Sequence, residues 1–283
     1  MKSVLSVQSH VCYGYVGNRA AVFPLQRLGF EVIAVNTVQF SNHTGYGDWG
    51  GESMSSEHIA SILAGLERRG VFQTLDAVLS GYLGEATLAQ QVAQTVRKIK
   101  SQSALLYCCD PVMGDQQGMF VKPEVAQMLQ KDCLPLADIL TPNLFELTYL
   151  SGKRIQTLSE LLEACRILHS LGPKTILVTS TEVRETPPGK IQMVLSQENQ
   201  RWLIETPKFE LHPAPNGSGD FTAAVFLAHV LKSADFKTAL ELTAASVFAV
   251  FEENFRSGER EFQIIQVQDR WMQPLIQFEA ISL

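Results

Sequence analysis

The sequence has no excess of positive charge and no long apolar run. Its 23 Lys and Arg residues are outnumbered by 29 Asp and Glu residues, and the formal net charge is -6 at pH 7. Nucleic-acid binding usually requires basic clusters, and the short ones here, Arg68-Arg69 and Arg97 to Lys100, lie in stretches of helical period. A membrane span needs about eighteen apolar residues, and no run approaches this length. The apolar part of MKSVLSVQSH is also too short for a signal sequence. We therefore expect no nucleic-acid partner, no membrane association and a cytoplasmic location.

The five cysteines show no metal-ligand spacing. Cys108 and Cys109 are adjacent inside an apolar run, whereas Cys12, Cys133 and Cys165 stand alone. Buried, reduced thiols are therefore favoured over a redox or metal role.

What the chain does have is enough apolar residues for a large core. Its 283 residues are 46% hydrophobic and 18% charged, and we find no internal repeat, low-complexity tract or linker. Parallel α/β proteins of this size often form one unit, so we expect a single domain over residues 1–283.

Short apolar runs alternate with longer stretches in which apolar residues recur at three and four. This alternation predicts an α/β fold with a mostly parallel central sheet, flanked by helices on both faces. The predicted strands are Val4 to Val7, Glu31 to Val38, Ala77 to Ser80, Ala104 to Cys109, Asp138 to Leu140 and Thr175 to Val178. The predicted helices lie in EHIASILAGLERRG, EATLAQQVAQTVRKIKSQ, KPEVAQMLQKDCL and TLSELLEACRILHSLG. Later, IQMVLSQENQRWLIETP predicts an antiparallel edge hairpin, and two helices follow, from about Gly219 to Lys232 and from about Phe236 to Glu253.

Polar and glycine-rich segments follow the predicted strands. In an open parallel sheet, ligands bind beyond the carboxyl ends of the strands. We therefore expect one rim made of SHVCYGYVGN, QFSNHTGYG, GYLG, DPVMG, TPNLFE and TSTE.

The stretch PNGSGDFTAA brings two glycines in front of Asp220 at a predicted helix start. Glycines allow close backbone approach, and N-H groups with the positive end of the helix dipole stabilise an anion. The stretch lacks the lysine of a Walker A loop. Asp220 has two possible roles: an N-terminal helix cap, or a general base that takes a proton from a substrate hydroxyl during phosphoryl transfer.

A second group of carboxylates lies on the same rim. Asp110 ends an apolar strand, and Asn143 and Glu146 are three residues apart near a helix start. This pair is either a cap with a surface carboxylate, or, together with Asp110, a set of oxygen ligands for Mg²⁺. The neighbouring glycine-rich stretch favours the metal.

These motifs, in this order along nearly the whole chain, resemble the ribokinase-like kinases and, among them, the pyridoxal kinases. The resemblance is carried by VQSHVCYGYVGNRAAVFPLQRLGF, VNTVQFSNHTGYGDW, LSGYLG, CDPVMGD, PLADILTPNLFEL, VTST and GSGDFTAA. It implies ATP-dependent phosphorylation of the 5′-hydroxymethyl group of pyridoxal, and of pyridoxine and pyridoxamine, in vitamin B6 salvage. It also implies a homodimer that uses Mg²⁺, often with a monovalent cation such as K⁺.

The resemblance also implies roles for individual residues. Asp220 would be the base, and Gly217 and Gly219 would supply amides for the phosphoryl group. The vitamin would contact Ser9, Val16, Thr44, Gly45, Tyr82 and Asp220. ATP would contact Asp110, Thr141, Glu146, Thr179, Ser180, Thr206, Pro207, Lys208 and Phe209, and the metal ligands among them would be Asp110 and Glu146.

Some features of the rim stay open. His43 is either a substrate contact or a loop residue that bonds its own backbone, and Tyr82 is either a ring-stacking residue or a core aromatic. Many relatives have tyrosine where Phe120 stands in DQQGMFVKP, and some bacterial relatives have lysine at Thr179. We expect residues Gln116 to Phe120 to close over ATP as a lid.

Two other classes of function compete with this one, namely another small-molecule kinase of the same superfamily and a carrier of B6 vitamers. A hydroxymethylpyrimidine kinase would resemble the loop, but such enzymes usually carry cysteine where this chain has Asp220, and a sugar kinase would not need the aromatic Tyr82. A protein that only carries B6 vitamers would have no physical need for the carboxylates Asp110 and Glu146.

Overall fold

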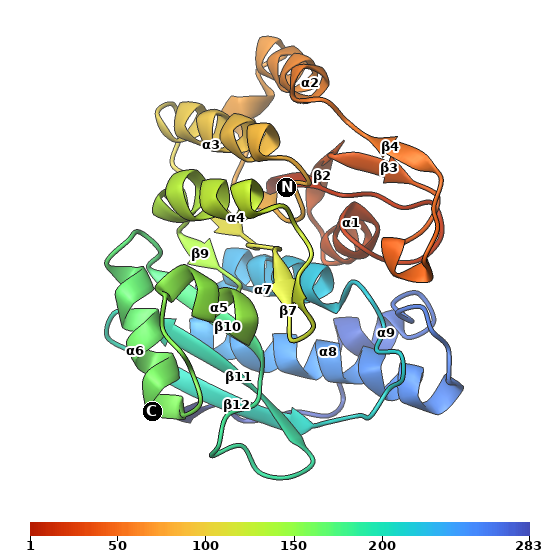
Figure 1. Ribbon diagram of the computed structural model, residues 1–283, viewed down its shortest axis with the longest axis vertical. Coiled ribbons are helices and arrows are strands. Elements are labelled where there is room, and N and C mark those ends of the chain that lie inside the picture. Colours follow the sequence, from red (N-terminus) through yellow and green to blue (C-terminus); the bar gives the residue numbers. More distant parts are fainter.

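The computed structural model describes residues 1–283 and has a nine-stranded sheet between two layers of helices (Figure 1). The strands follow the order β13-β12-β11-β10-β9-β6-β5-β1-β2. The parallel strands are β1 (Ser3–Gln8), β2 (Glu31–Asn36), β5 (Ala77–Ser80), β6 (Leu106–Cys109), β9 (Ile139–Leu140) and β10 (Thr175–Thr181). The antiparallel edge consists of β11 (Lys190–Gln197), β12 (Arg201–Pro207) and β13 (Ile281–Ser282). The predicted α/β fold with its edge hairpin is therefore confirmed.

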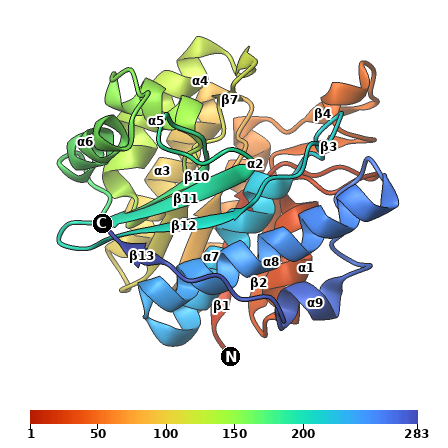
Figure 2. The same ribbon diagram turned by 90° about the horizontal axis from the view of Figure 1, so that it is seen from below.

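Helices cover both faces of this sheet, as the view from below shows (Figure 2). One face carries α2 (Ser56–Arg68), α3 (Ala86–Lys100), α4 (Pro123–Met128), α5 (Leu144–Ser151) and α6 (Leu158–His169). The other carries α1 (Asn18–Arg27), α7 (Ser218–Ser233), α8 (Phe236–Ser257) and α9 (Gln268–Met272). None of the helices combines the length and the apolar character needed to cross a bilayer.

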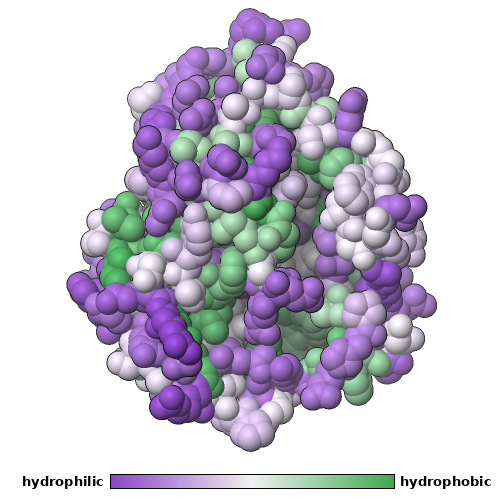
Figure 3. Space-filling view, viewed as in Figure 1, coloured by the Kyte–Doolittle hydropathy of each residue, from purple (hydrophilic) through white to green (hydrophobic).

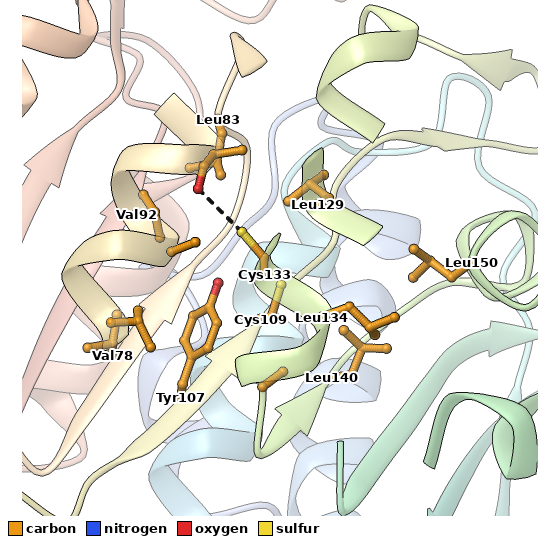
Figure 4. Packing of buried hydrophobic residues seen from close by; sticks show 14 of the residues in the cluster. Val78, Leu83, Val92, Tyr107, Cys109, Leu129, Cys133, Leu134, Leu140 and Leu150 are labelled. Atoms are coloured by element: carbon orange, nitrogen blue, oxygen red, sulfur yellow. Dashed lines mark hydrogen bonds between the residues drawn. The ribbon is translucent and has the colours of Figure 1, made fainter. Parts of the chain in front are cut away.

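The core has two parts, one on each face. On the α7 face every residue from Phe221 to Leu231 is buried, as expected for a helix that is apolar on all sides. The rings of Phe221 and Trp271 meet edge to face with centroids 5.5 Å apart. On the other face Tyr107 lies beside Cys109 and Cys133 (Figure 4). The thiol of Cys133 donates to the carbonyl of Ala89. Each fully buried large side chain stabilises the fold by roughly 1.5–3 kcal/mol, so both helix layers are firmly attached to the sheet.

Several local predictions were wrong. The run Glu31 to Val38 is not one strand, because β2 ends at Asn36 and the buried Thr37 donates its hydroxyl to the carbonyl of Tyr82. The chain then forms β3 (Val38–Phe40), which pairs with β4 (Gly51–Ser53) in a separate two-stranded sheet.

Helix boundaries and one thiol also differ from the prediction. Helix α1 was not predicted, since Pro24 inside it obscures the helical pattern. Helix α4 ends at Met128 and continues as a π turn and a 3-10 turn through Pro135, which cannot continue an α-helix. Of the cysteines, Cys12 is exposed, whereas the others are buried as expected.

Candidate active site

The glycine-rich stretch lies at the start of α7. The helix begins at Ser218, and its N-cap is Gly217, which has a φ of 90° and no side-chain cap. A Cβ atom on Gly217 would collide with the carbonyl oxygen of Tyr15 in the loop after β1, so only glycine fits. Asp220 is therefore the third residue of the helix, and of the two roles considered for it the N-terminal cap is excluded.

Asp220 is half-buried beside the loop that follows β1. Burial raises the pKa of its carboxyl to about 6, although hydrogen bonds from the N-H groups of Gly17 and of Asp220 itself favour the charged form. A carboxylate with a pKa just below neutrality is charged at pH 7 and still accepts a proton readily, as a general base must.

Asp110 is the buried centre of the cluster of carboxylates on the rim. It follows β6, and its N-H donates to the carbonyl of Ser80 at 2.8 Å. The hydroxyl of Thr141, after β9, donates to its Oδ1 at 3.1 Å. Its Oδ2 lies 4.0 Å from the position that a Cβ on Gly219 would take. Burial first, and then the charges of Glu146 and Asp220, hold the pKa of Asp110 well above its usual range.

Glu146 is buried at the start of α5 and forms a capping box with Asn143. Its Oε2 accepts the N-H of Asn143 at 2.9 Å, and its Oε1 accepts the N-H of Met113 at 3.0 Å. The amide oxygen of Asn143 accepts the N-H of Glu146 at 2.9 Å, while its amide nitrogen donates to the carbonyl of Gly114 at 2.8 Å. The helix cap considered for this pair is present, but the carboxylate is not on the surface, and burial raises its pKa.

The chemistry of these carboxylates suits a magnesium ion. No three His, Cys, Asp or Glu side chains are grouped so that they could hold a metal ion by themselves. Mg²⁺ keeps most of its water and needs only one or two carboxylates. Asp110 and Glu146 fit this requirement. A cation beside them would offset the burial that raises both pKa values and the charge of Glu146 that raises the pKa of Asp110.

The predicted vitamin-binding residues come from three loops. Ser9 and Val16 are buried after β1, and the carbonyl of Ser9 accepts the N-H of Asn18 at 2.8 Å. Tyr82 is half-buried after β5. Thr44 and Gly45 are exposed in the 3-10 turn η1 (Thr44–Tyr46) between β3 and β4.

Two contacts orient η1. The Nδ1 of His43 accepts the N-H of Gly45 at 3.1 Å, which confirms the interpretation of His43 as a loop residue that bonds its own backbone. A Cβ on Gly45 would lie 3.8 Å from the amide nitrogen of Asn216, next to the glycine-rich stretch. The turn therefore faces the start of α7.

The predicted nucleotide residues lie at the ends of β10 and β12. The N-H of Thr179 donates to the carbonyl of Pro142 at 2.9 Å, and the exposed Ser180 has a positive φ of 51°. Thr206 is buried and Pro207 half-buried, and the ammonium of Lys208 pairs with the Glu182 carboxylate at 2.7 Å.

The last residue of this group, Phe209, joins the segment after β12 to α8. Its ring lies 5.4 Å from that of Phe248 and 5.2 Å from that of Phe255. Lys208 also borders a hollow of about 260 Å³, which is lined further by Glu182, Val183, residues 186–190 and Glu210.

The face of the molecule is hollowed beside a small hairpin, on the side where α7 begins (Figure 3). The hairpin consists of β7 (Gly114–Asp115) and β8 (Gly118–Met119) and contains most of the predicted lid segment. Phe120 directly after it is 56% exposed, so its ring is free of the core.

Sequence reasoning missed two backbone donors of the site. The backbone N-H of Gly17 lowers the pKa of Asp220 and so favours its charged form, and the N-H of Met113 donates to Oε1 of Glu146 at 3.0 Å. A glycine just before the unpredicted α1 was a sequence signal for the Gly17 donor. The Met113 donor is a backbone N-H, and its side chain gives no such signal.

The rim of this parallel sheet has an uncapped helix start, an aspartate in the first turn of that helix and a cluster of buried carboxylates. These features define a class of protein, the small-molecule kinases with a ribokinase-like fold. Comparison with known proteins narrows this class. Residues 34–264 match the family model described as phosphomethylpyrimidine kinase.

Relatives and solved structures agree on a narrower group. Pyridoxal kinase PdxY of Rubrobacter xylanophilus is 45% identical over 279 residues, 98% of this chain and 96% of that protein. Pyridoxal kinase PdxY of Corynebacterium diphtheriae is also 45% identical, with 98% of each chain covered. The pyridoxal kinase of Leishmania donovani, solved in complex with ADP and pyridoxamine, superposes with a TM-score of 0.93 at 31% identity over 100% of both chains.

The chain belongs to the phosphomethylpyrimidine kinase family and, within it, to the pyridoxal kinases. The resemblance stated from the sequence motifs is thereby confirmed, as is the ribokinase-like kinase fold.

Proposed function

We propose that this protein transfers the terminal phosphoryl group of ATP to the 5′-hydroxymethyl group of pyridoxal in vitamin B6 salvage. The curated relatives are pyridoxal kinases of nearly the same length. The observation that carries the proposal is the position of Asp220 in the first turn of α7, beside Gly219 and with Asp110 close by. An aspartate there also separates this chain from the pyrimidine kinases, which usually have cysteine.

In the proposed reaction, Asp220 accepts the proton of the 5′-hydroxyl as its oxygen attacks the terminal phosphorus. A bond forms between this oxygen and phosphorus, the bond to the bridging oxygen breaks, and ADP leaves with the electron pair. The N-H groups around Gly217 and Gly219 and the positive end of α7 stabilise the charge on the transferred group. Most of the acceleration is then due to positioning and electrostatics, as in other phosphoryl transfers.

Asp110 and Glu146 would hold Mg²⁺, with Glu146 acting through metal-bound water because both its oxygens already accept backbone N-H groups. When bound, the ion would neutralise charge on the phosphate oxygens. Thr141 orients Asp110, and Thr179, Ser180 and the segment Thr206 to Phe209 would contact the nucleotide.

The vitamin would lie between the loops that carry Ser9, Val16, Thr44, Gly45 and Tyr82. We extend the proposal to pyridoxine and pyridoxamine, because these vitamers share the reacting hydroxymethyl group. We also propose one kinase domain over residues 1–283 that works as a homodimer, and stimulation by K⁺. Sedimentation and assays with K⁺ in place of Na⁺ test the last two points.

The test is to incubate the purified protein with ATP, Mg²⁺ and pyridoxal and to follow the absorbance of pyridoxal phosphate. We expect product from the wild type, and a turnover about 10²-fold to 10⁴-fold lower in Asp220→Asn, the usual range for a general base. Asp235→Asn is the matched control, because Asp235 caps α8 and asparagine caps a helix equally well.

Three outcomes would contradict the proposal in different ways. Binding of vitamer without product would indicate a carrier. Phosphorylation of hydroxymethylpyrimidine instead of pyridoxal would assign the pyrimidine activity. Near wild-type turnover in Asp220→Asn would remove the base role.

A further inference from the structure

Three side chains from distant parts of the chain meet behind η1. The hydroxyl of Tyr46 donates to Oε1 of Glu261, although the two residues are 215 positions apart. The guanidinium carbon of Arg260 lies 3.6 Å from the centroid of the Tyr46 ring. Its Nη2 also donates to the carbonyl of Gly45 at 3.0 Å. We call Tyr46, Arg260 and Glu261 the clamp.

The clamp is anchored to the core through α8. Asn254, in the last turns of this helix, is fully buried. Its amide nitrogen donates to the carbonyls of Glu259 at 2.9 Å and Glu261 at 2.8 Å, and its amide oxygen accepts the N-H of Gln263 at 3.1 Å. The backbone that carries the clamp residues is therefore fixed to a helix that packs on the sheet.

Glu261 also contacts the other loop proposed to bind the vitamin. A Cβ on Gly14, in the loop after β1, would collide with the Glu261 carboxylate. The Tyr13 ring meets the Tyr46 ring edge to face, with centroids 6.1 Å apart. One segment between α8 and α9 thus touches both the loop of Ser9 and Val16 and the turn of Thr44 and Gly45.

The rest of the loop between β3 and β4 offers η1 little support from the core. Thr44, Gly45 and residues 47–50 are exposed, and most of the other contacts of this loop are within itself, such as the donation from Asn42 to the carbonyl of Asp48 at 2.8 Å. The hydrogen bond to Glu261 raises the pKa of Tyr46 to about 12, so the phenol remains a donor at any working pH. Removing the clamp would leave Thr44 and Gly45 on a loosely held turn.

We propose that the clamp of Tyr46, Arg260 and Glu261 holds Thr44 and Gly45 in the position that binds the vitamin, and so sets the affinity for this substrate. This rests on the proposed function. The three residues are positioning residues, because they act through η1 and not on the reacting atoms. Since Asp220, Gly217 and the nucleotide segments are held by other contacts, the clamp controls the KM for pyridoxal and leaves kcat and the KM for ATP unchanged.

The test compares Tyr46→Phe, Arg260→Met and Arg260→Lys with the wild type. Tyr46→Phe removes one oxygen, and we expect a KM for pyridoxal raised about 10-fold, the size of one lost hydrogen bond to a charged group. Arg260→Met should raise it by a similar factor, and Arg260→Lys, which keeps a cation over the Tyr46 ring, by less. The matched control is Arg166→Met, which removes an exposed arginine paired with Glu163 at 2.7 Å on α6.

The second readout is the Kd for pyridoxal without ATP, measured by titration calorimetry, which should rise by the same factor as KM. If the wild type neither binds nor phosphorylates pyridoxal, the proposed function fails. If the wild type does both and Tyr46→Phe and Arg260→Met leave KM and Kd unchanged, the clamp is overturned. It is also overturned if either variant changes kcat or the KM for ATP as much as the KM for pyridoxal. Should Arg260→Met not fold, Tyr46→Phe decides alone.

Discussion

On one side of the hollow the polar groups are buried or half-buried at the ends of strands and the starts of helices, whereas on the other side they lie on an exposed turn. The first group, Asp110, Thr141, Glu146 and Asp220, is the carboxylate side. The second, Thr44 to Tyr46, is the turn side, and side chains from the segment after α8 hold it. The carboxylate side is fixed by the same hydrogen bonds that build the fold. The turn side is held by contacts with side chains outside the sheet and its helices.

This difference indicates a division of labour. Chemistry needs groups whose positions vary little, and elements packed on the sheet provide them. Selection of a small molecule needs contact residues that can change without loss of the fold, and in the proposed function the turn held by the clamp would provide them. The predictions below test whether stability and chemistry depend on the carboxylate side and affinity on the turn side.

The largest expected effect concerns the stability of α7, the helix that carries Asp220. His229 is 7% exposed on this helix, and burial lowers its pKa to about 4. Its pKa in the unfolded chain is about 6.5. Between these values the unfolded chain binds the proton and the folded protein does not. The contribution of His229 to stability is therefore fully present above about pH 6.5 and falls by up to about 3 kcal/mol as the pH drops toward 4.

Thermal unfolding at several pH values checks this, with His229→Gln, which should flatten the acid side of the profile. His58→Gln on α2, where the histidine is exposed, is the control. Equal pH profiles for the wild type and His229→Gln would mean that α7 does not hold His229 uncharged, as a rigid, buried helix must.

The next effect separates chemistry from helix capping on the carboxylate side. Glu146 and Glu160 occupy the same position in two capping boxes, but only Glu146 is buried beside Asp110. Glu146→Gln should lower kcat roughly 10-fold to 100-fold through weaker metal binding. Glu160→Gln should cost at most about 1 kcal/mol of stability and leave kcat unchanged. Steady-state kinetics over a range of Mg²⁺ concentrations measures kcat for both variants. Equal kcat values in the two variants would contradict a metal role for Glu146.

The smallest effect is expected on the turn side. Thr44 is exposed, so Thr44→Val should leave the melting temperature unchanged. Loss of one hydrogen bond to the vitamin should raise the KM for pyridoxal about 3-fold to 10-fold, with kcat unaffected. Kinetics and melting of the same preparation check this. A clear fall in melting temperature would erase the distinction between the two sides.

The carboxylate side could be predicted from the sequence because its signals are local. Asp110 follows an apolar strand, Asn143 and Glu146 have capping spacing, and Asp220 follows two glycines. The sheet and most helices were predicted for the same reason, since alternation and helical period are properties of short stretches. The errors fall where tertiary contacts override the pattern, as at Thr37, whose bond to Tyr82 separates β2 from β3.

The turn side could not be predicted in this way. The segment QFSNHTGYG was expected on the rim, but a contact of Thr44 and Gly45 with the vitamin was implied only by resemblance to known kinases. Arg260 and Glu261 lie in a short charged stretch with no periodic signal, and their partner Tyr46 is more than two hundred residues away. A charged run is usually a solvated surface, so its sequence does not indicate a contact that only the folded chain creates.

The close approach of Gly217 to the loop after β1 has a consequence for how this protein can change. A Cβ at Gly217 would meet the carbonyl of Tyr15, and one at Gly17 would meet the carbonyl of Ser9, whereas Gly152 and Gly189 have open space around them at a similar positive φ. Asparagine can replace the latter two at modest strain, but no residue with a side chain fits the former two. Positions 17 and 217 therefore tolerate almost no substitution. Substitutions that change substrate preference are accepted far more readily on the turn side than at the start of α7.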